Sequence, residues 1–176
     1  MHQREACRLL EVDRVNNLSA AGQQYLAAAG VMEYLGTVLL PKWFPTPGVL
    51  TRRPVECSPT WCLGLAWLFE ASAQSCAVVK ALTKGGTETL PAYAIMTKIS
   101  MSVVEKCQSS LDVIEPAVLA FVGPAFSGYV GYIREIHHAL AFYYYGEMQF
   151  HADECGLAMS YYRRAKVRLL LLLLLM

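Results

Sequence analysis

Apolar and small residues recur at helical spacing along most of the chain, and no stretch of any length shows the strict alternation of a half-buried strand. The clearest helical pattern covers residues 136–165, on both sides of one break near residues 151–153. Gly146 and Ala158 are small enough to let two antiparallel helices approach closely. The aromatic side chains expected to fill the contact are Phe142, Tyr145 and Tyr162.

This spacing of large and small residues is similar to that of a tetratricopeptide helix pair. Such a pair usually belongs to a scaffold that presents a binding surface and is rarely a catalyst. One pair cannot bury its own apolar face, because repeats of this kind need neighbours. We therefore expect further helices, rather than an isolated pair.

The same period predicts four helices before this pair. They are expected over residues 5–15, 19–40, 58–83 and 89–113. Pro41 should end the second helix, and a proline-rich loop should follow over residues 42–54. Ser58 should cap the third helix, with Pro59 at its first position, and Gly85-Gly86 should stop it.

Residues 115–123 are expected to form a connection, and the fifth helix should begin near Phe126. The chain is thus predicted to be all-α, an antiparallel helical array with the tetratricopeptide-like pair at its C-terminal end. We expect an N-terminal extension over residues 1–18, one helical domain over 19–168 and a poly-leucine tail over 169–176.

Composition narrows the class of protein. The 176 residues are 55% hydrophobic and 16% charged, which excludes disorder and indicates extensive burial between helices. The net charge of +1 gives no reason to expect a nucleic-acid partner. The six cysteines include no CxxC pair and no signal peptide is visible, so reduced thiols in the cytoplasm are expected.

The residues that most resemble a catalytic or metal site do not have the required spacing. His137, His138, His151 and Asp153 match neither a structural zinc pattern nor an HExxH helix, so no metal is expected. Cys76 lies in no cysteine-protease signature. We therefore expect no catalytic residues, no cofactor and no small-molecule substrate.

Two segments raise the question of a membrane. Residues 116–133 are uncharged over about 18 positions, the lower limit for a span, but prolines and glycines interrupt them. The seven leucines at 169–175 are too short to span a bilayer. Basic residues precede them, and these are compatible either with an anionic membrane surface or with a solvated helix face. They are Arg163, Arg164, Lys166 and Arg168.

The order of four segments resembles the middle and distal helices of a Bro domain, the boomerang-shaped domain of Alix, its yeast counterpart, the rhophilins and the prenylated Bro-domain-only proteins. The segments are YLAAAGVMEYLGTVLLP, SPTWCLGLAWLFEASAQSCAVVKAL, AIMTKISMSVVEKC and HHALAFYYYGEMQFHADECGLAMSYYRRA. The resemblance covers roughly residues 23–166. Its most specific pieces are Ala73-Gln74 with Lys80-Ala81, Lys98-Ile99, and the Ala139, Tyr143, Gly156 and Ala158 set.

The resemblance implies a non-catalytic scaffold of the endosomal sorting (ESCRT) pathway, cytoplasmic and peripheral on endosomal membranes. Such a domain binds the C-terminal amphipathic helix of an ESCRT-III subunit in a hydrophobic groove. The matching groove positions are Ala77, Ile95 and Ile99, with Lys98 beside them. Alix-like members carry a larger residue where this chain has Ala77. Ile95 and Ile99, one turn apart, are equally compatible with a core face.

The chain also departs from the family. A full Bro domain is longer and includes an N-terminal β-containing part, and the prenylated members end in a Cys-containing box, whereas this chain ends Leu-Leu-Leu-Met. Three other interpretations therefore stay open. They are a tetratricopeptide-like adaptor for other peptides, a small helical membrane protein that uses residues 116–133 as its span, and a fragment without independent function.

Overall fold

The computed structural model describes residues 2–43, 54, 57–84 and 89–174, with side chains described from residue 16 to residue 172 within these ranges. Its described residues form helices and short connections without a strand, so the all-α prediction is confirmed. The helices are α1 (His2–Tyr34), a π-helical turn η1 (Leu35–Leu39), α2 (Leu40–Trp43), α3 (Pro59–Lys84), α4 (Leu90–Val113), α5 (Pro116–Val122), α6 (Pro124–His151) and α7 (Cys155–Leu174).

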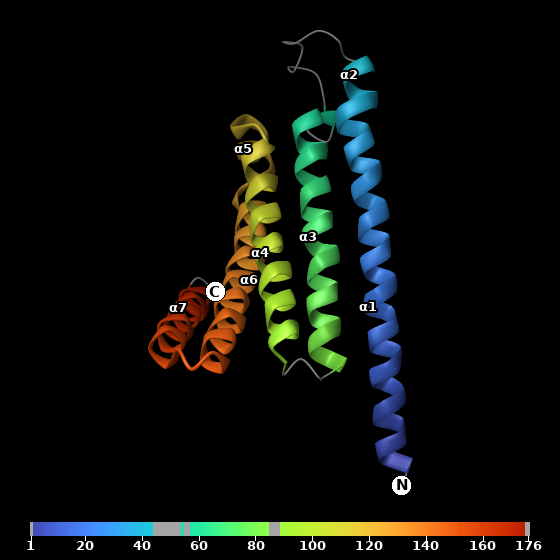
Figure 1. Ribbon diagram of the computed structural model, residues 1–176. Coiled ribbons are helices and arrows are strands. Elements are labelled where there is room, and N and C mark those ends of the chain that lie inside the picture. The colour runs from blue at the N-terminus through green and yellow to red at the C-terminus, as the bar shows by residue number, and fades with distance from the viewer. Residues whose placement is uncertain (1, 44–53, 55–56, 85–88, 175–176) are drawn as a thin grey trace.

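The long helices lie beside one another with alternating direction (Figure 1). α3 packs between α1 and α4, α4 packs on α6, and α7 packs on α6 at the edge of the array. Two apolar clusters join α3, α4 and α6. The first contains Leu68, Ala71, Val103, Cys107 and Val130, and the second contains Val78, Tyr93, Met96 and Tyr144.

Small residues set the close spacing of α3 and its neighbours. A Cβ added to Gly64 would lie 2.4 Å from the Ile114 side chain, and one added to Gly36 would lie 2.9 Å from the Pro59 carbonyl oxygen. The Ser110 hydroxyl donates a 2.7 Å hydrogen bond to the Gly64 carbonyl across the α3–α4 contact. Neither glycine position has room for a side chain, so larger residues would push the helices apart.

The α6–α7 contact has the close approach that the sequence predicts at Gly146. A Cβ there would lie 2.7 Å from the Tyr162 ring and 3.4 Å from the Ala158 carbonyl oxygen. Tyr161, which the sequence prediction omitted, packs with its ring centroid 4.6 Å from that of Tyr145. The break is also where it was predicted, since α6 ends at His151 and α7 begins at Cys155. The finer assignment to the tetratricopeptide class stays a prediction.

The predicted break between residues 15 and 19 is wrong, because α1 is one helix from His2 to Tyr34. The segment contains asparagines and a serine but neither proline nor glycine, and packing on α3 supports its later turns. The domain boundary expected at residue 18 therefore falls inside a continuous helix.

Pro41 does not end the helix, which corrects a second prediction. The backbone widens into the π-helical turn η1 directly before it, and the Leu40 N–H bonds to the Leu35 carbonyl. A wider turn relieves the clash between a proline ring and the preceding turn, so the helix continues through α2 to Trp43. The rest of the loop predicted to Pro54 lies mostly outside the described residues.

The third and fourth predicted helices correspond to α3 and α4, with Pro59 and Pro91 in their first turns. Gly85-Gly86 lies outside the described residues. The connection predicted over residues 115–123 is wrong, because Pro116 begins the short helix α5. Gly123, with φ of 90°, then separates α5 from α6, which begins at Pro124 rather than near Phe126.

The bend at Gly123 bears on the membrane interpretation of residues 116–133. α5 and α6 meet at 101°, so they form a span only if a bent pair counts as one. Among the described residues, α3 is also long and apolar enough to cross a membrane by length and composition. Its position between α1 and α4 is equally that of a core helix in a helical bundle.

The close approach at Gly146 predicts opposite effects for two matched changes in α6. Gly146→Ala should lower the free energy of unfolding by about 1–3 kcal/mol, because the hydrogen bond from the Tyr162 hydroxyl to Glu147 restrains the ring that must move. Gly131→Ala, where an added Cβ meets nothing within 4 Å, should raise it by about 0.5–1 kcal/mol. Urea unfolding measures both, and equal effects would contradict the packing argument.

Candidate functional site

One contact between α3 and α4 shows which face of this helix pair is exposed to solvent. Lys106 on α4 forms an ion pair with Glu70 on α3, and its ammonium lies 4.8 Å from the centroid of the exposed Trp67 ring. Both members of the ion pair are partly exposed, at 33% for Glu70 and 18% for Lys106. The pair therefore crosses the line where α3 and α4 meet at the surface.

The residues expected to bind a partner lie on this same side. Ala77 is seven residues after Glu70 along α3, and Ile99 is seven residues before Lys106 along α4. Seven residues are two helical turns, which return a side chain to within about 20° of its starting direction. Because the helices are antiparallel, both steps run the same way, so Ala77 and Ile99 share one face of the pair.

The four residues differ in how far they are exposed. Ile95 is 56% exposed, Ala77 and Lys98 are exposed, and Ile99 is half-buried against the cluster around Met96. The core interpretation that the sequence left open thus fits Ile99 in part and does not fit Ile95. Ile95 is therefore placed to contact a partner at the surface, and Ile99 is placed to support it from below.

A hollow of about 530 Å³ adjoins this face between α1 and α3. Ala73 and Ala77 form part of its wall on α3, and Gln23 and Leu26 lie opposite on α1. Small side chains at these α3 positions leave the surface low between its two neighbours. We call the surface formed by Gln23, Leu26, Ala73, Gln74, Ala77, Ile95 and Ile99 the outer groove.

Two polar features line the hollow. The Gln74 side-chain oxygen is buried and accepts no hydrogen bond from the described residues. The Lys80 ammonium donates a hydrogen bond to the Ser19 hydroxyl and so connects α3 with α1. An apolar surface with a nearby cation is suited to a peptide that carries both apolar and polar side chains.

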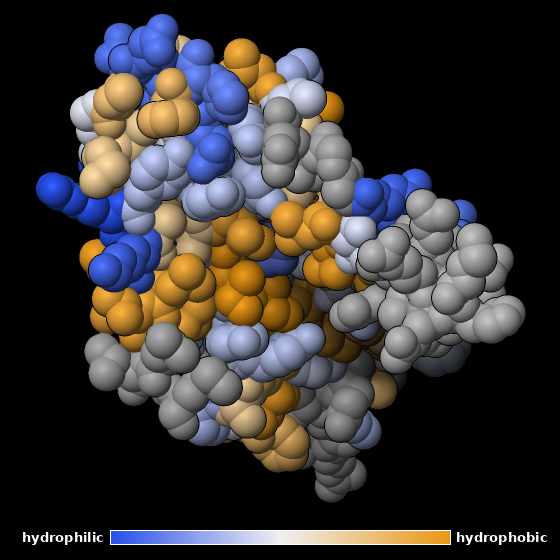
Figure 2. Space-filling model, turned by 90° about the horizontal axis from the view of Figure 1, so that it is seen from below, coloured by the Kyte–Doolittle hydropathy of each residue, from blue (hydrophilic) through white to orange (hydrophobic). Residues whose placement is uncertain are grey.

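Apolar side chains continue beyond the outer groove toward the end of the array where α3 finishes and α4 begins. Figure 2, which views the molecule from that end, shows apolar surface gathered at its centre. Exposed apolar residues near this end of the array are Val79 and Leu82 on α3, Leu90 on α4 and Phe150 on α6. Exposed apolar surface of this kind is typical of a docking site.

A second, smaller hollow of about 240 Å³ lies among α1, α3 and α6. It is lined by Tyr25, Tyr129 and Ile133, with Cys76 and His137 beside them. Burial raises the pKa of the Cys76 thiol, which keeps it protonated. Cys76 and His137 come from helices far apart in the chain, and no cysteine-protease signature surrounds Cys76, so their proximity was not predicted.

His137 links α6 to α3 through a hydrogen bond whose direction the neighbours determine. The Ser75 hydroxyl donates to the Ala71 carbonyl at 2.9 Å and lies 2.9 Å from His137 Nε2. With its proton committed, Ser75 accepts from an Nε2–H, and the other ring nitrogen, Nδ1, is buried without a partner among the described residues. This arrangement does not make Ser75 a nucleophile activated by His137, since Nε2 has no free lone pair.

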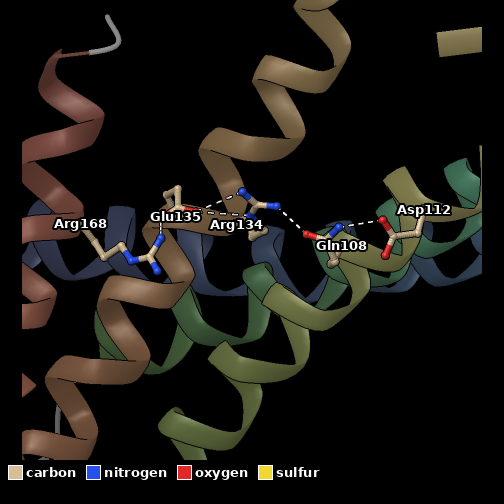
Figure 3. Close-up of polar contacts among 5 residues, drawn as sticks. All are labelled: Gln108, Asp112, Arg134, Glu135 and Arg168. Atoms are coloured by element: carbon tan, nitrogen blue, oxygen red, sulfur yellow. Dashed lines mark hydrogen bonds and ion pairs between the residues drawn. The ribbon is translucent and has the colours of Figure 1, made fainter. Parts of the chain in front are cut away.

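A polar network that the sequence analysis missed joins α4, α6 and α7 (Figure 3). Glu135 accepts hydrogen bonds from Arg134 at 3.3 Å and from Arg168 at 2.5 Å. Arg134 also donates to Gln108, which in turn donates to Asp112. Only the spacing of Gln108 and Asp112, one turn apart on a helix, is visible in the sequence.

The network lines a hollow of about 500 Å³ together with His138. Burial and then the nearby Arg168 lower the pKa of His138. His137 and His138 thus face different neighbours, as expected of adjacent helical residues. No group of three His, Cys, Asp or Glu side chains that could hold a metal ion occurs among the described residues.

Burial of His137 predicts a pH-dependent stability. Burial lowers its folded-state pKa to about 4 from an ordinary value of 6.5, so the unfolded chain binds the extra proton between these values. The free energy of unfolding should be highest above pH 6.5 and should fall by about 3 kcal/mol as the pH drops to 4. Urea unfolding of His137→Gln should show a smaller slope, whereas the exposed control His151→Gln should retain it. An unchanged slope in His137→Gln would contradict the assignment.

No family model matches the sequence, and comparisons with curated proteins and with solved structures find no match.

Proposed function

We propose that this chain is a non-catalytic protein-interaction scaffold that binds an amphipathic helix in the outer groove. The observation that carries the proposal is that the exposed Ile95 lies on the same face as Ala77. Ala77 lines the hollow of about 530 Å³ between α1 and α3. An exposed isoleucine beside an open apolar hollow provides both an anchor and a space for an anchor from the partner.

The shape of the groove supports a helical partner. Its floor on α3 consists of small residues such as Ala73 and Ala77, while Leu26 on α1 and Ile95 on α4 stand on either side. A helix laid over such a floor presents apolar residues at intervals of three and four, which meet these side walls in turn. Ala77 in this arrangement receives a partner side chain rather than supplying one.

Charge indicates what should surround the apolar stripe of the partner. Lys98 is exposed on α4 beside Ile95, and Lys80 lines the hollow on α3. Acidic side chains flanking the apolar stripe would therefore increase the rate of association and select the orientation of the bound helix.

The resemblance noted in the sequence suggests the first partner to test, the C-terminal amphipathic helix of an ESCRT-III subunit. This partner would place the scaffold in the cytoplasm and on the surface of endosomal membranes. A general tetratricopeptide-like adaptor would use the same groove for a different peptide, so the choice between the two depends on the peptide that binds.

The groove predicts that Ile95→Asp weakens binding of an ESCRT-III C-terminal helix peptide by about tenfold or more, because a carboxylate replaces an exposed apolar anchor that the bound helix would cover. Fluorescence anisotropy with a labelled peptide measures the dissociation constant. Phe121→Asp on α5, at a residue 75% exposed, is the matched control and should leave affinity unchanged. Circular dichroism should show that both variants remain helical.

Three outcomes would contradict parts of this proposal. Absence of saturable binding to the unaltered chain would reject the ESCRT-III partner. Binding unchanged by Ile95→Asp would reject the outer groove as the site. Equal affinity for an unrelated amphipathic helix would favour the general adaptor.

A further inference from the structure

The charge of α7 differs from that of the rest of the chain. Its sequence from Cys155 to Leu174 has no acidic residue, whereas the whole chain has a net charge of only +1. Arg168 is engaged with Glu135 of α6. The three remaining cations of the helix are all exposed, and they are Arg163, Arg164 and Lys166.

Apolar side chains are exposed on the same helix, and most of them follow the cations directly. α7 buries Ala158, Ala165 and Leu172, which recur every seven residues and define the side that packs on α6. Among the described side chains of α7, six other aliphatic residues are between 43% and 55% exposed. They are Leu157, Met159, Val167, Leu169, Leu170 and Leu171.

Helical spacing places a mixed surface on the side of α7 that faces away from α6. Val167 and Leu171 are one turn apart there, with Arg163 and Arg164 about one turn before them. α7 lies at the edge of the array, and its principal packing contact is with α6 (Figure 1). Among the described residues, no other helix covers this side.

An anionic bilayer matches both features of this surface. An apolar segment with adjacent cations lies well at the boundary between lipid headgroups and acyl chains, where leucines enter the apolar layer and long basic side chains reach lipid phosphates. A second copy of the chain matches less well. A two-fold symmetric contact whose axis passes near residues 163–166 would place the same three cations of each copy opposite one another.

We propose that α7 docks the protein on an anionic membrane surface. Leu170 and Leu171 enter the boundary between headgroups and acyl chains, while Arg163, Arg164 and Lys166 contact lipid headgroups. The proposal does not depend on what the outer groove binds, because the groove is formed by α1, α3 and α4.

The test is co-sedimentation of the full chain with two kinds of vesicle. One contains phosphatidylcholine alone, and the other also contains about 30% phosphatidylserine, which gives its surface a strong negative charge. The full chain should partition onto the anionic vesicles and not onto the neutral ones, and added salt should weaken binding. The triple change R163Q/R164Q/K166Q should reduce partitioning by about five-fold per charge removed, on the order of 100-fold in all. L170S/L171S should also reduce it while preserving helicity.

A charge-matched control separates a specific surface from net charge. The double change K42Q/K84Q removes two exposed cations outside α7 and the outer groove, and it should leave partitioning nearly unchanged. The matched double change R163Q/R164Q should reduce partitioning by about 25-fold. Equal losses for the two double variants, or equal binding to neutral vesicles, would overturn the proposal. A dimer in light scattering that L170S/L171S converts to a monomer, without vesicle binding, would instead identify a second copy as the occupant.

Discussion

The close packing of α3 against both of its neighbours is the constraint on which the remaining structure depends. Gly36 lets α1's continuation approach the Pro59 carbonyl, and Gly64 lets the Ile114 side chain and the Ser110 carbonyl approach from the other side. These contacts leave no space for even one methyl group. The positions of α1 and α4 relative to α3 therefore depend on the two glycines, which have no side chain, as much as on the side chains that pack around them.

The same preference for small residues shapes the surface of α3. Ala73 and Ala77 keep its outer side low, and the hollow between α1 and α3 follows from this. On the opposite side of α3, Ser75 binds His137 of α6 and carries a polar contact into an otherwise apolar region. One helix thus supplies a tight core contact, a groove floor and a link to the next layer.

The helix boundaries that could be predicted from the sequence are those determined by residues close to the boundary itself. Pro59, Pro91 and the break near Asp153 mark helix ends by their own backbone preferences, and the sequence placed these correctly. Pro41 has the same preference, but a π-helical turn before it absorbs the clash, and no local pattern announces that turn. α5 was missed because a proline that starts a helix and a proline that ends one look alike in sequence.

The candidate site also has features that local sequence predicts and features that only the packing of helices determines. Helical spacing placed Ile95 and Ile99 one turn apart, but only the packing of α4 decides that Ile95 is exposed while Ile99 supports the core. The distance between Ala77 and Ile99 depends on the axial offset between α3 and α4. The Glu70–Lys106 ion pair shows this offset in the structure, whereas the sequence does not determine it. The network of Arg134, Glu135 and Arg168 was missed for the same reason, since its partners come from three helices.

The positions of the outer groove and of α7 determine how the two proposed interactions combine. α1 and α7 lie at opposite edges of the array, with α3, α4 and α6 between them (Figure 1). A bilayer that contacts the outer side of α7 therefore does not cover the groove between α1 and α3. The link from Arg168 to Glu135 ties α7 to α6, so docking would orient the rigid array rather than only its last helix. A partner helix attached to the same membrane would then meet a groove held at a fixed position relative to that membrane, which would raise its effective concentration without any change in the groove itself.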